Sequence, residues 1–150
     1  LLAVWALVYP FTARTEKSPP PTPSPTVLGK PDMHEQVERL LDSSEAAEEW
    51  LKLDPAALTL LEHICTNPTV TPERRARALR ALGKQGGQAL VPNIQPFLDA
   101  DELMLRQAAA LTLGYVGGTE AKKALVERLL KEEDPSVRES IQRSLTTLEP

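Results

Sequence analysis

Apolar residues recur every three or four positions along most of the chain after residue 32, a spacing that places them on one face of an α-helix. The first run follows Asp32-x-x-Glu35, a capping box whose two side chains can bind free backbone amides of the first turn. Its apolar side contains Met33, Val37, Leu40 and Leu41. We therefore expect a helix that starts at Asp32 and packs on a core.

Two more short helices are expected before residue 70. Ser44 can cap the first, whose apolar positions are Ala47, Trp50 and Leu51. The second is expected to start at Asp54-Pro55, because proline at the first helical position loses no hydrogen bond, and to end at Asn67-Pro68. Its apolar stripe is Leu58, Leu61 and Cys65, with Leu60 and Ile64 beside it.

From Thr71 the sequence repeats itself. Three windows, at residues 75–83, 106–114 and 138–146, each begin with arginine and start 31 and 32 residues apart. The matching apolar positions are Ala78, Ala109 and Ile141, and then Leu82, Leu113 and Leu145. A two-helix unit that recurs at this period predicts an all-α fold of the α-solenoid type, in which each helix pair buries a face that it cannot bury alone.

A second helix is expected after each of the first two windows. Gly86-Gly87 and Gly117-Gly118 stand at the same offset and can form the left-handed turn that ends a helix. The matching apolar positions are Leu90, Ile94 and Leu98, and then Ala121, Leu125 and Leu129. Pro96 predicts a kink or an early end in the first of these helices, and Thr119 is expected to cap the other.

The third window departs from the other two because Thr146 stands where they have glycine. Its apolar stripe is narrow, and hydroxyl side chains flank it. This pattern is typical of a capping repeat whose outer side is polar.

Residues 1–13 are apolar and free of charge, whereas about 20 such residues are needed to span a bilayer. Three interpretations stay open: the end of a transmembrane helix, the tail of a signal peptide, or an apolar segment that folds onto another protein. Aromatic residues gather towards its end, and Arg14 and Lys17 follow, an order typical of a membrane interface. We favour a single membrane anchor, with the periplasmic or extracytoplasmic side preferred for the rest of the chain.

Residues 14–31 are rich in proline and low in complexity. Proline fixes φ and removes backbone donors, so neither helix nor sheet is expected. An extended polyproline II segment of this length reaches roughly 50 Å. We expect a semi-rigid linker to a helical domain at residues 32–150; a ligand for a proline-binding domain is the alternative.

The net charge of −4 is unevenly distributed. Nine acids and two bases lie between residues 32 and 71, whereas the next helix has a basic stripe of Arg74, Arg77, Arg80 and Lys84. One interpretation is a set of solvated helix faces; the other is that the basic stripe binds a partner. The acidic balance and the scarcity of aromatic residues argue against nucleic acid.

We identify no residue for catalysis, for a metal or for a cofactor. Cys65 is the only cysteine and lies in an apolar run, so a buried thiol is expected. His34 and His63 are far apart, with no ligand spacing around them. The glycine clusters at residues 83–87 and 114–118 are interpreted as helix stops rather than phosphate-binding loops.

Adjacent acids do not form a catalytic pair here either. Glu48-Glu49 and Glu132-Glu133 are next to each other in the sequence, and neighbours on a helix point to different sides. General acid–base work needs a cleft and a shifted pKa, and the sequence indicates neither.

The windows at residues 106–117 and 134–145 resemble HEAT repeats, of the short type seen in phycobilisome lyase subunits. The resemblance covers residues 71–148, and residues 32–66 are compatible with a degenerate first repeat. It implies an arginine ladder, bonded to acids or carbonyls in the stack, of Arg75, Arg106 and Arg138. It also implies a concave binding face lined by second helices, where the exposed candidates are Asn93, Gln95, Glu127, Arg128 and Lys131.

We therefore expect a non-catalytic scaffold that mediates protein–protein interaction, as an accessory subunit of a membrane-associated complex. No cofactor and no small-molecule substrate are expected. Two alternatives remain: an enzyme subunit similar to bilin lyases, which rests on fold analogy alone, and a helical repeat protein that binds nucleic acid through the basic stripe.

Overall fold

The computed structural model describes residues 32–43 and 54–148, which lie within a unit that spans Pro31–Pro150. Every regular element in these ranges is a helix, so the all-α prediction is confirmed for them. The elements are α1 (Met33–Asp42), α2 (Ala57–Thr66), α3 (Pro72–Gly86), η2 (Gly87–Leu90), α4 (Val91–Ile94), η3 (Gln95–Asp99), α5 (Leu103–Val116), α6 (Gly118–Leu129) and α7 (Pro135–Thr147).

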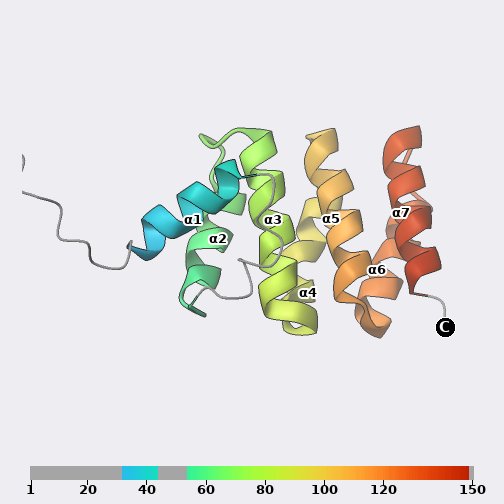
Figure 1. Ribbon diagram of the computed structural model, residues 1–150. Coiled ribbons are helices and arrows are strands. Elements are labelled where there is room, and N and C mark those ends of the chain that lie inside the picture. The colour runs from blue at the N-terminus through green and yellow to red at the C-terminus, as the bar shows by residue number, and fades with distance from the viewer. Residues whose placement is uncertain (1–31, 44–53, 149–150) are drawn as a thin grey trace, which may run out of the picture. The chain divides into compact units, whose positions relative to one another are not determined.

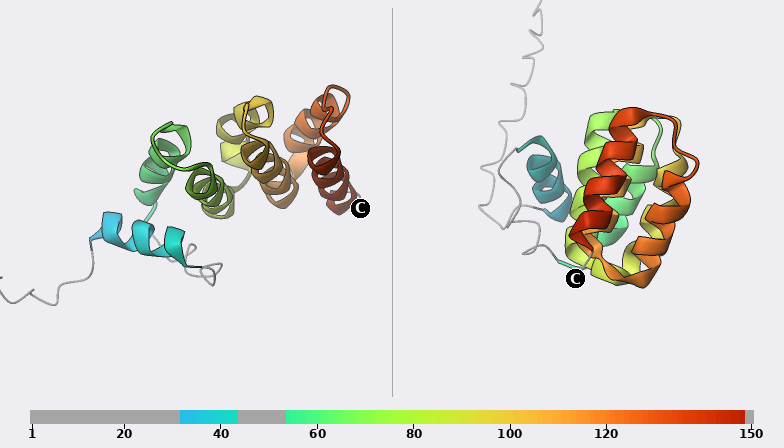
Figure 2. Two further views of the ribbon diagram at one scale, coloured as in Figure 1. Left: turned by 90° about the horizontal axis from the view of Figure 1, so that it is seen from above. Right: turned by 90° about the vertical axis from the view of Figure 1, so that its right-hand side faces the viewer.

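The first helices of the repeats, α3, α5 and α7, lie side by side in one row (Figure 1). The second helices, α2, α4 with η3, and α6, form a row behind them, as the left view of Figure 2 shows. Contacts link α3 to α5 and α5 to α7, and α2 packs on α3. Helix α1 contacts both α2 and α3 at the start of the front row.

The repeated apolar positions meet in one hydrophobic core. Ala78, Ala109 and Ile141 are fully buried, each on a front-row helix. Leu82 and Leu113 are buried as well, and Leu145 packs on the core from the last helix. A shared interior of this kind is what the 31-residue period predicts, because each helix pair needs its neighbour to bury both faces.

Two glycines set the close approach of the front-row helices, a role that their interpretation as helix stops missed. Gly83 lies inside α3, and a Cβ there would stand 2.2 Å from Cγ2 of Thr112 on α5. At Gly114, inside α5, a Cβ would stand 2.6 Å from the Cβ of Ser144 on α7. The residues that stop these helices are Gly87 and Gly117, whose φ angles are +57° and +74°.

Helix α1 begins directly after Asp32 as predicted, but its expected capping bond is absent, and two other helix starts differ from the expected ones. The side chain of Asp32 makes no capping bond to α1. Helix α6 begins at Gly118, directly after the left-handed Gly117, so Thr119 lies inside its first turn and does not cap it. Helix α2 begins at Ala57 because Asp54 holds the preceding turn, where its carboxylate accepts from the Ala56 amide at 2.8 Å.

Pro96 ends regular α-helix as predicted. Helix α4 stops at Ile94, and the chain continues as the 3-10 helix η3 through Pro96. Proline lacks the amide that an α-helix needs at that position, and the tighter turn avoids the need for it.

Several predictions fall on residues that the structure does not describe. They are the apolar segment at residues 1–13, the linker at residues 14–31, and the short helix expected after Ser44. Within residues 32–43 and 54–148, no helix combines the length and the hydropathy needed to cross a bilayer.

Candidate functional site

The arginine ladder lies at the end of the helix rows where each second helix meets the next first helix. The Nε of Arg75 donates to the carbonyl of Cys65, at the end of α2, at 2.9 Å. Its Nη1 also pairs with a carboxylate oxygen of Glu102 at 2.8 Å. Carbonyls at a helix end have no partner within the helix, so the guanidinium satisfies one of them and joins neighbouring repeats.

The other two arginines occupy the same place in their repeats. Nη1 of Arg106 donates to the carbonyls of Ala100 and Asp101, both at 2.9 Å. Nη1 of Arg138 donates to the carbonyls of Leu129 at 3.0 Å and Glu132 at 2.8 Å. Each ladder residue thus bonds backbone carbonyls at the end of a second helix or just after it, which is a structural task.

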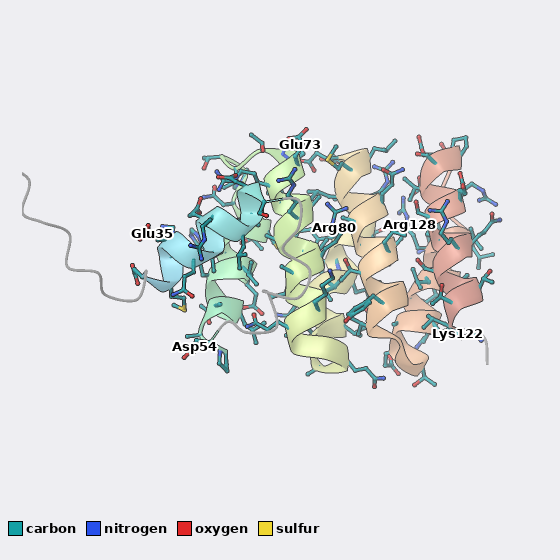
Figure 3. All side chains as sticks on the ribbon, in the orientation of Figure 1. Glu35, Asp54, Glu73, Arg80, Lys122 and Arg128 are labelled. Atoms are coloured by element: carbon teal, nitrogen blue, oxygen red, sulfur yellow. The ribbon has the colours of Figure 1, made fainter. Side chains whose placement is uncertain are left out.

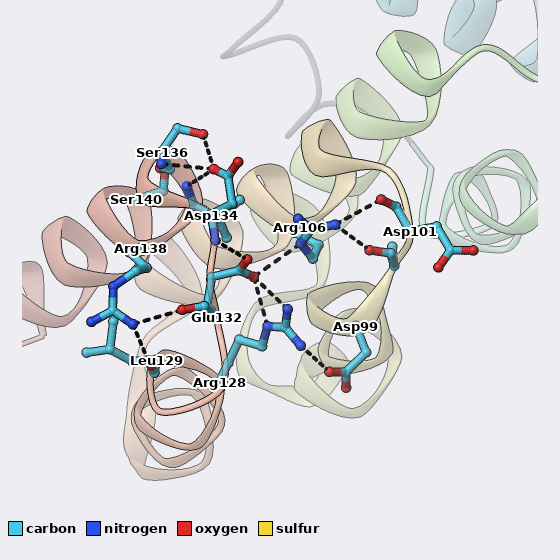
Figure 4. Close-up of polar contacts among 12 residues, drawn as sticks. Asp99, Asp101, Arg106, Arg128, Leu129, Glu132, Asp134, Ser136, Arg138 and Ser140 are labelled. Carbon is cyan, nitrogen blue, oxygen red and sulfur yellow. Dashed lines mark hydrogen bonds and ion pairs between the residues drawn. The ribbon is translucent and has the colours of Figure 1, made fainter.

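Glu132 is the centre of a buried ionic network (Figure 4). Only 4% of the residue is exposed. One carboxylate oxygen accepts from Arg106 at 3.1 Å and from Arg128 at 3.0 and 2.6 Å, and the other accepts from the Asp134 amide at 3.0 Å. Arg128 also pairs with Asp99 at 2.6 Å, which ties η3 to α6.

The electrostatics of this network keep the carboxylate ionised. Burial by itself would raise the pKa of Glu132, but hydrogen bonds from Arg128 and the Asp134 amide, together with the charges of Arg128 and Arg106, lower that pKa overall. The same pairing raises the pKa of Arg128 despite the opposite effect of burial. A carboxylate held ionised with its oxygens bonded is not poised to take up a proton in a reaction.

The predicted residues of the second helices fall into two groups. Gln95, Glu127 and Lys131 are exposed, and they line a small hollow between η3 and α6. Arg128 lines the same hollow but is held by Glu132 and Asp99, and only 17% of its side chain is exposed. Asn93 lies apart, where its amide donates to Glu62 of α2 at 2.7 Å.

The basic stripe is divided by its contacts with α1. Arg74 pairs with Glu38 and with Asp42, the latter at 3.6 Å, and Nη1 of Arg77 donates to the Leu41 carbonyl at 2.6 Å. The charges of Arg80 and Lys84 have no partner among the residues that the structure describes.

Arg80 and Lys84 line a pocket with Leu111, Thr112 and Tyr115 of α5. Arg80 projects from α3 beside α5 in Figure 3. Tyr115 is 61% exposed. Sequence reasoning missed Leu111 and Tyr115, since nothing in the pattern shows which side of α5 faces the basic stripe.

A third hollow lies between α2 and the turn of α4 and η3, and it includes His63, Cys65 and Phe97. Burial raises the pKa of the Cys65 thiol to about 12, so the thiol stays protonated and unreactive. In residues 32–43 and 54–148, His, Cys, Asp and Glu side chains nowhere gather in a group of three that could hold a metal.

The comparison with known proteins agrees with the repeat. No curated protein matches the chain. A family model described as HEAT repeats matches residues 70–146, from just before α3 to the last turn of α7. The matched stretch covers the three arginine windows and more than half of the chain. The chain therefore belongs to the HEAT-repeat family.

Proposed function

We propose that this protein is a non-catalytic scaffold that binds other proteins through the outer surfaces of its helix rows. HEAT repeats are commonly protein-interaction scaffolds. The repeat itself supports the proposal, because stacked helix pairs of an α-solenoid use their interior for stability and offer their exposed helices to a partner. The observation that carries the proposal is the buried Glu132 network. Its polar groups bond to one another between the repeats and are not poised for a reaction, which leaves the exposed helix surfaces for binding.

The hollow between η3 and α6 is the first candidate surface. Arg128 is fixed there by Glu132 and Asp99, so the exposed Gln95, Glu127 and Lys131 stand on a rigid support. A rigid support lowers the conformational entropy that binding must remove, which favours recognition. The mixture of amide, acid and base suits a polar protein surface.

The assignment to a membrane-associated complex rests on the sequence of residues 1–31. An apolar run followed by cations and a proline-rich spacer is the arrangement that holds a domain off a bilayer. We propose that the helical repeats act as an accessory subunit on the periplasmic or extracytoplasmic side.

Site-specific photo-crosslinking in membranes tests the proposal. A photoreactive amino acid replaces Gln95 or Lys131 in the full chain, and the same residue placed at Glu73, which is exposed on α3, serves as the matched control. We expect a discrete crosslinked protein from the two hollow positions and a weaker or different product from the control. Crosslinks to RNA, or no crosslinked protein from any position, would contradict the proposal, and equal products from all three positions would reject the hollow as the binding surface.

A further inference from the structure

The basic stripe on α3 is one surface with two parts in different surroundings. Arg74, Arg77, Arg80 and Lys84 follow each other three or four residues apart, so they lie on one face over successive helical turns. The first two residues bond to α1, although Arg77 stays exposed, and the last two reach solvent beside α5. The part bonded to α1 therefore shows which chemistry this face accepts.

Helix α1 meets the stripe as an acidic amphipathic helix. Its apolar residues Val37, Leu40 and Leu41 enter the core. The carboxylates of Glu38 and Asp42 pair with Arg74. A carbonyl near its C-terminal end accepts from Arg77 at 2.6 Å. Apolar burial and charge pairing thus act together on neighbouring turns of the same face.

The rest of the stripe offers the same combination, with no occupant from the described part of the chain. Among the residues that the structure describes, Arg80 and Lys84 are two cations without a charged partner, Leu111 and the exposed ring of Tyr115 supply apolar surface, and no carboxylate lines the pocket. Arginine and tyrosine are among the residue types that contribute most to the binding energy of protein interfaces. A tyrosine exposed beside two cations is favourable for an acidic partner, because the partner neutralises the cations while it covers the ring.

We propose that this pocket, lined by Arg80, Lys84, Leu111 and Tyr115, binds an acidic amphipathic segment of a partner protein. The carboxylates of that segment pair with Arg80 and Lys84, and one apolar side chain packs on Leu111 and Tyr115. The inference rests on the proposed function, and it names the partner chemistry for the front row of helices.

Fluorescence anisotropy of a labelled model peptide on the full chain tests this inference. The probe has glutamates on one side and leucines on the other, and its matched control has glutamine in place of each glutamate. We expect the glutamate peptide to bind at least about tenfold more tightly than the glutamine peptide.

Charge reversal locates the binding. The double variant Arg80→Glu and Lys84→Glu should weaken binding of the glutamate peptide at least about tenfold. The control double variant Lys122→Glu and Lys123→Glu, which reverses two exposed cations on α6, should change that binding less than about twofold. Tyr115→Ala should also weaken it, and Tyr115→Phe should not. Circular dichroism checks that each variant keeps its helix content. If the charge-reversed chain does not fold, the result for Tyr115→Ala decides the inference.

Three results would overturn the inference. One is equal weakening by the α6 variant, which indicates non-specific attraction. Another is unchanged binding when Arg80 and Lys84 are reversed. The third is binding about tenfold stronger when Glu45, Glu48 and Glu49 are changed to glutamine, which assigns the pocket to the acidic stretch of this same chain.

The crosslinking at Gln95 and Lys131 separates this inference from the proposed function. Discrete crosslinked proteins together with no peptide binding would reject only the pocket. Peptide binding at Arg80 and Lys84 without any crosslinked protein in membranes would reject the scaffold role assigned to the hollow.

Discussion

The buried Glu132 network and the open end of the basic stripe contain the same kinds of side chain in opposite settings. At Glu132, two guanidinium groups and a backbone amide surround one carboxylate with almost no solvent. At Arg80 and Lys84, two cations line a surface pocket in which the described residues include no carboxylate. A buried charge must be paired because its desolvation is costly, whereas an exposed one need not be. Each charge in the first region therefore depends on its paired neighbour, whereas the charges of the second region face solvent.

Removal of Glu132 is expected to have the largest effect on stability. Glu132→Ala leaves Arg106 and Arg128 without their shared carboxylate, and we expect the free energy of unfolding to fall by about 3 kcal/mol. The exposed neighbour offers a matched control, since Glu133→Ala should change the free energy of unfolding by less than about 0.5 kcal/mol. Urea unfolding followed by circular dichroism measures both. Equal effects of the two variants would show that burial does not distinguish them.

Acid should weaken the same network in the unmodified chain. The pKa of Glu132 is lower in the folded chain than its ordinary value of 4.5, so the unfolded chain takes up the proton first. Its stabilisation is complete above that value and is lost as the pH falls through the folded pKa. Urea titrations from about pH 7 to about pH 3 should show this loss, and Glu132→Gln should flatten the curve in that range. An unchanged slope in the variant would assign the acid sensitivity to other carboxylates.

Loss of the contact between α3 and α1 should have an intermediate effect. Arg77→Ala removes the hydrogen bond to the Leu41 carbonyl, and we expect a loss of about 1 kcal/mol. Hydrogen exchange should speed up mainly in the amides of α1. Faster exchange spread equally over α5 and α7 would mean that Arg77 supports the whole core rather than this one helix.

The smallest effect on stability is expected at the open end of the stripe. The paired change Arg80→Ala and Lys84→Ala should alter the free energy of unfolding by less than about 0.5 kcal/mol, because neither charge has a bonded partner in the described chain. A loss as large as that of Arg77→Ala would place both residues among the structural contacts and remove the distinction between the two regions.

Much of the fold followed from local pattern. The period of the three windows gave the front-row helices, and the buried positions of Ala78, Ala109 and Ile141 agree with it. Positive φ at Gly87 and Gly117 agrees with the predicted stops. Helix α1 begins directly after Asp32 as predicted, but the capping bond expected there and the cap expected at Thr119 do not form, because a capping motif states which bond is possible and the approach of the chain decides whether it forms.

The candidate sites were harder to predict, because they depend on which helix faces pack against each other. The sequence shows Glu132 as one of two adjacent acids, and only the packing of α5 against α6 and α7 brings Arg106 and Arg128 to it. In the same way, the placement of α1 gives Arg74 and Arg77 their partners, whereas Arg80 has none within residues 32–43 and 54–148.

The sequence by itself determined the helical class, the repeat period and the family, since each depends on the spacing of side chains along one segment. The tertiary structure decided which charges are buried, which are paired and which face solvent. These properties depend on distances between segments far apart in the chain, and small shifts in helix packing change them while the repeat pattern stays the same.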